Sequence, residues 1–235
     1  MTFIGVIPAR GGSKGIPRKN LALCADQSLL AHASASALQS NVLQRVILST
    51  DAEEIAAAGR ALGLEVPFLR PPALAEDDTL MVEVLRHLLD WLTETGQRVD
   101  GLVLLQPTSP LRRAAHVAEA VAQFEATGAA TLVSVTRVPH QFTPGSVMEL
   151  KQGALTPWQS SQPNVLRRQD KPELYARNGP AILIVRPDLV RAGQLYGDPT
   201  VGYLMSAHDS VDVDGPEDLW LAELLLRGRQ ERAPA

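Results

Sequence analysis

The sequence contains little cysteine and few aromatic residues. Cys24 is the only cysteine in 235 residues, which excludes an internal disulfide and a cysteine-rich metal site. Aromatic residues make up 4% of the chain while hydrophobic residues make up 45%, so the core must be mostly aliphatic. No apolar run is long enough to span a membrane, and no basic start followed by an apolar stretch marks a secretion signal. We therefore expect a cytoplasmic protein that does not bind membranes.

The sequence also lacks an excess of basic residues. Lys and Arg number 22 against 26 Asp and Glu, which gives a net charge of −4. This balance argues against general nucleic-acid binding, so any recognition of phosphate must come from a local patch. A chain of 235 residues is long enough for one α/β domain with a well-buried core.

Strand patterns alternate with helical patterns along the chain. Asp51 is expected to cap one of the helices, and a short extended piece is expected at 65–69. The alternation predicts a mostly parallel, twisted sheet with right-handed crossovers, flanked by helices. The predicted strands are 3–7, 46–50, 101–105 and 131–136, and the predicted helices are 28–40, 52–62, 80–95, 114–127 and a last one that ends near 227.

A basic, glycine-rich loop follows the first predicted strand. Its sequence, PARGGSKGIPRKN at 8–20, contains four cations and no acid. Glycines let backbone N–H groups approach a ligand closely, and cations beside them neutralise phosphate oxygens. The loop therefore predicts a polyphosphate site, with a solvated basic turn as the alternative. Its spacing matches neither the Walker A loop nor the dinucleotide-binding fingerprint.

Two aspartates near the end of the chain form a candidate metal site. Asp212 and Asp214 fall on one face of an extended segment, because side chains alternate along a strand. Two neighbouring carboxylates repel each other unless a cation lies between them, and hard oxygen ligands suit Mg²⁺. The alternative is that Asp214 caps the last helix, which has Pro216 in its first turn. The spacing of the pair alone leaves both interpretations open.

The loop resembles the signature of a known family. VIPARGGSKGIPRKN is similar to the signature of the cytidylyltransferases that activate sialic acid and related nonulosonic acids, the CMP-N-acylneuraminate cytidylyltransferases. QPTSPLR at 106–112, Asn178-Gly179 and the Asp-x-Asp of 212–214 resemble further motifs of this family. The strand after Asn178 departs from the family pattern at Pro180 and Leu183, so the sequence does not identify the sugar.

The resemblance implies a fold and an assembly. It extends from residue 4 to residue 218 and implies one Rossmann-like nucleotidyltransferase domain over 1–235. The proline-rich stretch 137–175 has no steady period, and irregular stretches of this length are usually functional or cover a partner. In the family this place corresponds to a dimerisation excursion that reaches towards the neighbouring subunit's site. The resemblance therefore implies a homodimer.

The resemblance also implies a reaction and a set of site residues. The reaction couples CTP to a nonulosonic acid, such as N-acetylneuraminate or legionaminate, and gives the CMP-sugar and pyrophosphate with the help of Mg²⁺. None of the five histidines lies in a recognised motif, so no general base is predicted. The implied residues are Arg10 and Lys19 for catalysis; Ala9, Gly11, Gly12, Ser13, Lys14, Asn20, Arg70, Ala75 and Thr79 for the nucleotide; Gln106, Thr108, Ser109, Arg168 and Asn178 for the sugar; and Asp212 and Asp214 for the metal.

Several alternatives remain at this stage. Arg168 also fits a solvated basic turn, and Thr108 or Ser109 alone could cap the helix at 114–127. A nucleotidyltransferase acting on Kdo or on a sugar phosphate would use the same loop and metal with another acceptor pocket. A non-catalytic nucleotide-binding regulator is a further possibility, although binding alone would not require the acidic pair.

Overall fold

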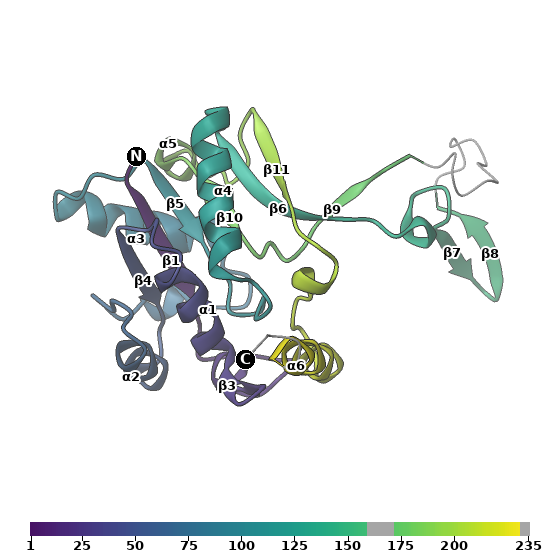
Figure 1. Ribbon diagram of the computed structural model, residues 1–235, viewed down its shortest axis with the longest axis horizontal. Helices are drawn as coiled ribbons and strands as arrows, with labels where there is room; N and C mark the ends of the chain where they lie inside the picture. The colour runs from purple at the N-terminus through teal and green to yellow at the C-terminus, as the bar shows by residue number, and fades with distance from the viewer. Residues whose placement is uncertain (159–171, 231–235) are drawn as a thin grey trace.

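A seven-stranded, mostly parallel sheet forms the centre of the molecule (Figure 1). The computed structural model describes residues 1–158 and 172–230. The strand order is β11-β6-β10-β5-β1-β4, and β9 pairs with β6. β1 is parallel to β4 and β5, and β6 is parallel to β11, whereas β9 and β10 run antiparallel to their neighbours. The bounds are β1 Phe3–Pro8, β4 Arg45–Ser49, β5 Gly101–Leu104, β6 Thr131–Arg137, β9 Tyr175–Arg177, β10 Leu183–Val185 and β11 Thr200–Leu204.

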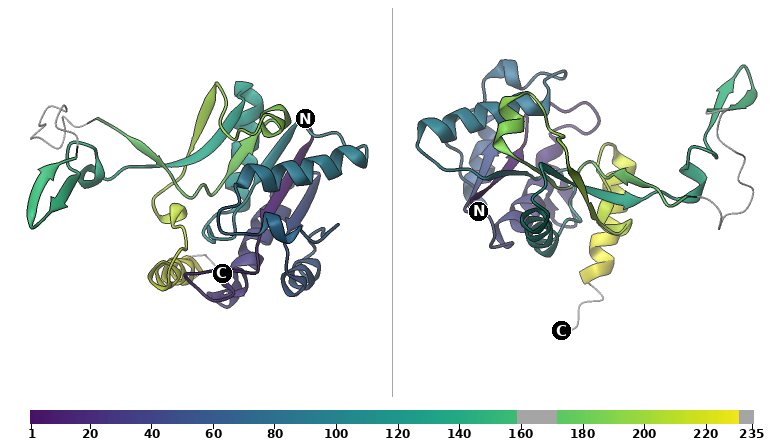
Figure 2. Two further views of the ribbon diagram at one scale, coloured as in Figure 1. Left: turned by 180° about the vertical axis from the view of Figure 1, so that it is seen from behind. Right: turned by 90° about the horizontal axis from the view of Figure 1, so that it is seen from above.

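Helices cover both faces of the sheet (Figure 2). One face packs against α1 Leu29–Leu38, α2 Glu53–Ala61 and α4 Ala114–Thr127, and the other packs against α3 Met81–Glu94 and α5 Pro187–Arg191. The alternation of side chains in β1 serves both cores, because Phe3 and Ile7 point to the first and Ile4 and Val6 to the second. Strands covered on both faces are expected to be almost wholly apolar, as β1 is.

The structure confirms the predicted α/β fold and corrects two local expectations. The segment 65–69 is not a strand and contributes one bridge, between Ile47 and Glu65, because Pro67 has no N–H group to extend a ladder. Asp51 does not cap α2, since the capping position is Ala52 and the Asp51 carboxylate accepts a hydrogen bond from Gly11 N–H. The sequence analysis also gave no indication of α5 or β11.

An arm projects from the sheet between β6 and β9 (Figures 1 and 2). Its described part contains a hairpin of β7 Met148–Lys151 and β8 Ala154–Pro157, where the sequence analysis expected no regular structure. The turn is Gln152-Gly153, with φ of 50° and 84°. Two residues with positive φ are what a tight two-residue hairpin turn requires, and Gly153 is typical of such a turn whereas Gln152 is not.

The last helix packs against residues from the beginning of the chain. α6, Pro216–Gln230, contributes Ala222 to a small apolar cluster with Val213 just before the helix, and with Ile16 and Leu29 from the first 30 residues. Gly15 lies so close to this segment that a Cβ atom there would be 2.3 Å from the Asp214 carbonyl oxygen. Residue 15 must therefore be glycine for the basic loop to meet the two aspartates. No helix in the described ranges is long and apolar enough to cross a membrane.

Candidate active site

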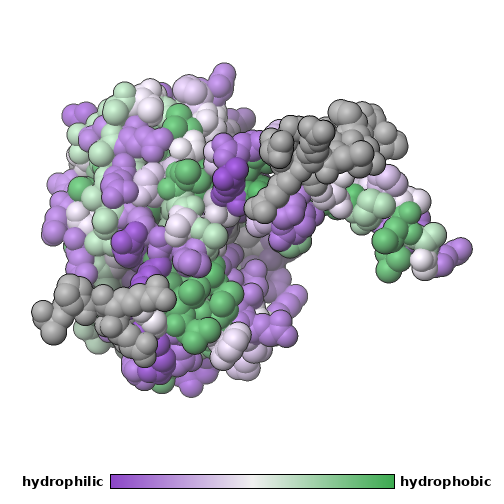
Figure 3. All heavy atoms as spheres, turned by 45° about the vertical axis from the view of Figure 1, so that its right-hand side comes forward, coloured by the Kyte–Doolittle hydropathy of each residue, from purple (hydrophilic) through white to green (hydrophobic). Residues whose placement is uncertain are grey.

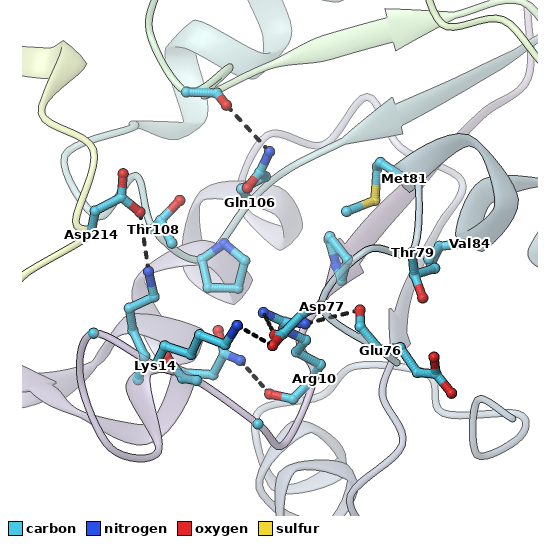
Figure 4. Close-up of a pocket in the computed structure, with 18 of the residues that line it drawn as sticks. Arg10, Lys14, Glu76, Asp77, Thr79, Met81, Val84, Gln106, Thr108 and Asp214 are labelled. Atoms are coloured by element: carbon cyan, nitrogen blue, oxygen red, sulfur yellow. Dashed lines mark hydrogen bonds and ion pairs between the residues drawn. The ribbon is translucent and has the colours of Figure 1, made fainter. Parts of the chain in front are cut away.

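A cavity of about 540 Å³ opens beyond the carboxyl ends of β1 and β5 (Figure 4). Its walls come from the basic loop, from the loop between residue 70 and α3, from 106–108, and from Gly179, Asp212 and Asp214. Open α/β sheets bind ligands at this edge. Segments that are far apart in the sequence therefore share one binding site.

Two cations of the basic loop converge on one carboxylate, Asp77 (Figure 4). Arg10 Nη2 lies 2.8 Å from Asp77 Oδ1, and Lys14 Nζ lies 2.5 Å from Oδ2. Lys14 and Arg10 hold the pKa of Asp77 below its usual value. Arg10 also donates to the Glu76 carbonyl oxygen at 3.0 Å. Asp77 thus neutralises Arg10 and Lys14, and the phosphate groups of a ligand would compete with Asp77 for these two side chains.

Other predicted residues of the loop either fix its course or line the cavity. The Asn20 side chain is buried and donates to the Arg10 carbonyl oxygen at 2.9 Å, which fixes the course of the loop. Gly11 N–H donates to Asp51 Oδ1 at 2.9 Å, so this N–H already has a partner. Ala9 is buried. Gly12 and Ser13 do line the cavity, together with Asn20.

Lys19 connects the basic loop to the aspartate segment. Its Nζ donates to the Val213 carbonyl oxygen at 2.9 Å and lies 3.3 Å from Asp214 Oδ1. The lysine side chain is 17% exposed, whereas that of Asp214 is 81% exposed. The lysine is therefore held in place by the protein, while the Asp214 carboxylate is open to the cavity.

Asp212 has features that suit a cation. Its Oδ1 is buried and has no hydrogen-bond partner among the described residues. Burial raises the pKa of Asp212 above its usual value, and the Thr108 hydroxyl opposes this shift by a hydrogen bond. A Cβ atom at Gly179, where φ is +114°, would lie 3.2 Å from this carboxylate, so glycine is needed beside it.

The two carboxylates fit Mg²⁺ only with help from a ligand. In the ranges that the structure describes, no cluster of three His, Cys, Asp or Glu residues could hold a metal ion. Mg²⁺ commonly binds one or two carboxylates and takes its other ligands from phosphates and water, which agrees with Asp212 and Asp214. Gly215, rather than Asp214, directly precedes α6, and Asp218 accepts the N–H groups of Asp214 and Gly215 at 3.0 and 2.8 Å.

Arg70 is another predicted residue that lines the cavity. It is buried and donates to the Ser49 carbonyl oxygen and hydroxyl and to the Leu74 carbonyl oxygen. Burial lowers the pKa of Arg70 to about 10, so the guanidinium stays charged at neutral pH. Thr79, Met81 and Val84 complete this wall, whereas Ala75 does not line the cavity.

The predicted sugar-binding residues divide into two groups. Gln106 and Thr108 line the cavity, and Gln106 Nε2 donates to the Gly179 carbonyl oxygen at 3.5 Å. Ser109 and Asn178 are buried and do not line it. The Asn178 carboxamide accepts from the Ser134 hydroxyl at 2.6 Å and donates to the Ser210 hydroxyl at 2.9 Å. Arg168 lies outside the described residues.

Sequence reasoning missed several residues that line the cavity. Asp77 stands in the acidic run Glu76-Asp77-Asp78, which could have suggested a partner for the basic loop. Met81 and Val84 form an apolar wall, but their positions also fit the core-facing stripe of α3, so the sequence offered no separate signal. Gly179 was noted only as the neighbour of Asn178.

Comparisons with known proteins identify relatives of this chain. The profile of the family described as Cytidylyltransferase matches residues 4–189. The CMP-N,N'-diacetyllegionaminic acid synthase of Legionella pneumophila subsp. pneumophila is 33% identical over 233 residues, which are 98% of this chain and 99% of the relative. The N-acylneuraminate cytidylyltransferase of Escherichia coli O18:K1:H7 is 32% identical over 94% of this chain, and the match spans 51% of that longer protein.

Solved structures agree on the fold. A CMP:2-keto-3-deoxy-manno-octonic acid synthetase complexed with CTP has a TM-score of 0.72 and 17% identity, and the match covers 97% of this chain and all of that chain. At this identity the similarity establishes the shared architecture.

Replacing Asp77 by Asn should strengthen polyphosphate binding. The substitution removes a carboxylate that competes for Arg10 and Lys14. Inorganic tripolyphosphate, measured by isothermal titration calorimetry at low salt, should bind about three- to tenfold more tightly, the range expected for releasing partly exposed ion pairs. The matched control is Asp78→Asn, because Asp78 is exposed and no ion pair involving it is found in the described part of the chain. Equal affinities for the two variants would show that Asp77 does not compete with phosphate.

Proposed function

The chain belongs to the cytidylyltransferase family, and on this premise we propose that it couples CTP to a nonulosonic acid to give the CMP-sugar and pyrophosphate. One observation carries the proposal: the basic loop and the two aspartates line a single cavity of about 540 Å³. The names of the relatives from Legionella and Escherichia, which act on legionaminic acid and N-acylneuraminic acid, support this class of acceptor.

The proposed reaction is a direct displacement at the α-phosphorus of CTP. The anomeric hydroxyl oxygen of the sugar forms the new bond to phosphorus, the bond from the α-phosphorus to the bridging oxygen breaks, and pyrophosphate leaves. Such transfers depend on in-line placement and on neutralising charge more than on covalent catalysis. Arg10, Lys14 and Lys19 supply cations along one wall, where they would hold the triphosphate and stabilise the charge that develops on pyrophosphate.

Asp212 and Asp214 would hold Mg²⁺ in the proposed reaction. The buried, unpartnered Oδ1 of Asp212 and the exposed carboxylate of Asp214 support this assignment. When bound, the ion would neutralise phosphate oxygens and lower the pKa of the attacking hydroxyl. Lys19 remains bonded to the Val213 carbonyl oxygen between the two aspartates, so it can serve the triphosphate without releasing the segment.

The two ends of the cavity suit the two substrates. We assign the cytosine to the wall of Arg70, Thr79, Met81 and Val84, where apolar surface lies beside a charged donor. We assign the sugar to the wall of Gln106, Thr108 and Gly179, which lies beside the aspartates. Ser109 and Asn178 would support this wall from inside the protein. Because CTP is a cytoplasmic metabolite, we place the reaction in the cytoplasm.

We further propose that two copies associate through the arm. Its large apolar side chains lie open to solvent in a single chain, and Figure 3 shows apolar residues at its end. Leu150 and Leu155 lie directly opposite each other in the hairpin and are 68% and 63% exposed. Phe142 and Trp158 are 65% and 62% exposed. A second copy of the chain would remove this apolar surface from water.

The release of pyrophosphate tests the reaction and the acceptor together. The purified protein with CTP and Mg²⁺ should release pyrophosphate with one of N-acetylneuraminate, legionaminate or pseudaminate. Turnover only with Kdo or with a sugar 1-phosphate would retain the nucleotidyltransferase and refute the nonulosonate assignment. CTP binding without turnover on any acceptor would favour a regulator.

Replacing Asp214 by Ala tests the metal assignment. The side chain is 81% exposed, so the fold should survive, which circular dichroism can check. We expect pyrophosphate release to fall by about 100-fold or more, as for the loss of other groups that stabilise transition-state charge. Glu217→Ala, a change at another exposed acid three residues further along the chain, should leave the rate unchanged. An unaltered dependence of the Asp214 variant on Mg²⁺ concentration would remove the aspartate pair from the mechanism.

Placing charge on the hairpin tests the dimer. Light scattering should give the wild-type protein twice the chain mass of 25.3 kDa, and the double variant Leu150→Asp, Leu155→Asp should give the single mass. Leu23→Asp is the control, since Leu23 is 66% exposed but lies in β2, Leu23–Cys24, on the body of the protein. A wild-type monomer, or a double variant that remains a dimer, would contradict association through the arm.

A further inference from the structure

Arg112 is a buried arginine without a counter-ion. The residue is 3% exposed, and no acidic side chain among the described residues pairs with its guanidinium. Burial lowers the pKa of Arg112 to about 9, so the group remains charged at neutral pH. A buried, unpaired charge is costly, and apolar residues of similar volume are often as stable or more stable in such places. The presence of this charge therefore calls for a role other than packing.

The guanidinium donates to groups from three different segments of the chain. Nη1 donates to the Gln106 carbonyl oxygen at 2.9 Å and to the Ala181 carbonyl oxygen at 2.7 Å. Nε donates to the Ser36 hydroxyl of α1 at 3.1 Å, while Nη2 is buried without a partner in the described part of the chain. A single nitrogen thus joins the two carbonyl groups, and the contact with α1 fixes the guanidinium plane.

The two carbonyl groups lie where adjacent strands separate. The ladder between β5 and β10 ends at the pair Leu104 and Leu183. Gln106 and Ala181 each lie two residues beyond that pair, past the last ladder contact. Without Arg112, the Ala181 carbonyl group would lose its donor, and Gln106 would keep only the N–H of Ser109, at 3.4 Å. Arg112 therefore connects the two chain segments by hydrogen bonds at the point where the β5–β10 ladder has ended and the cavity begins.

The cavity wall on this side continues from the same two places. The Gln106 side chain reaches the Gly179 carbonyl oxygen, and both residues line the cavity. Gly179 in turn packs against the Asp212 carboxylate, to which an added Cβ would come within 3.2 Å. A shift in the distance between the two strand ends would thus move the sugar wall, whereas Arg10 and Lys14 are held by Asp77 from another segment.

We propose that Arg112 is a positioning residue that sets the spacing of the sugar-binding wall by bridging the Gln106 and Ala181 carbonyl groups from inside the protein. The inference rests on the proposed function, since it assigns this wall to the acceptor. Arginine suits the task because its planar guanidinium offers several donors in fixed directions, whereas a lysine ammonium sits on a flexible stem.

The test compares Arg112→Met and Arg112→Lys with a control variant in α3, Leu88→Ala. Leu88→Ala removes a fully buried side chain of α3, which lowers stability without touching the sugar wall. For Arg112→Met, the KM for the nonulosonate should rise by about tenfold or more while the KM for CTP changes by less than about twofold, since small misplacements near reacting groups have large effects. Arg112→Lys should fall between Arg112→Met and the wild type, and Leu88→Ala should change neither KM.

Hydrogen–deuterium exchange supplies a readout that does not need turnover. Amides in 104–108 and 178–182 should exchange faster in the Arg112 variants than in the wild type, with no such local change in Leu88→Ala. If Arg112→Met does not fold, Arg112→Lys should show the same changes at smaller size.

Two results would overturn the proposal. One is an equal rise in the KM for both substrates, and the other is a loss of melting temperature like that of Leu88→Ala with unaltered exchange in the two segments. A wild-type protein that is silent with every nonulosonate would refute the proposed function, and the exchange experiment would still decide the role of Arg112.

Discussion

The close contact between Gly15 and the backbone of Asp214 is the constraint on which the site depends. It brings a basic loop near the start of the chain against an acidic segment near its end, with room for no side chain at residue 15. The apolar cluster that includes Ile16 and Val213 holds the two segments together, and Lys19 joins them through the Val213 carbonyl oxygen. The cations of the loop and the two carboxylates can share one cavity because the backbones, rather than the opposite charges alone, keep the two segments in contact.

The charges of the site are balanced within the protein itself. Arg10 and Lys14 pair with Asp77, and Lys19 pairs with Asp214. These pairs are at least partly exposed, and exposed ion pairs contribute little to stability, so a ligand with several phosphate groups can replace the carboxylates at low cost. Binding of CTP and Mg²⁺ would then exchange one set of ion pairs for another. Arg10, Lys14 and Lys19 would pair with phosphate groups, and Asp214 would pair with the metal. This exchange suits a chain with a net charge of −4, whose field does not by itself attract an anionic nucleotide.

The sequence predicted the fold better than the orientation of side chains within the site. The helical and strand periods located the main elements of the sheet within one or two residues, because burial on both faces of the sheet leaves a strong apolar pattern. The partnership of Arg10 with Asp77 could not be deduced, since it joins residues 67 positions apart, which local patterns do not connect. Likewise nothing local distinguishes Thr108, which lines the cavity, from Ser109, which is buried beside it. The hairpin of the arm also had no strong signal, because Gln152 takes a position of its turn where Asn, Asp or Gly is typical.

The most direct test of this account is a crystal structure of the protein with CTP and Mn²⁺, in which anomalous scattering locates the metal. The account predicts a metal ion bound by Asp212 Oδ1, Asp214 and phosphate oxygens, with the triphosphate contacting Arg10 and Lys14 in place of Asp77 and the cytosine beside Arg70. A triphosphate elsewhere on the protein, or a metal ion without contact to either aspartate, would contradict it.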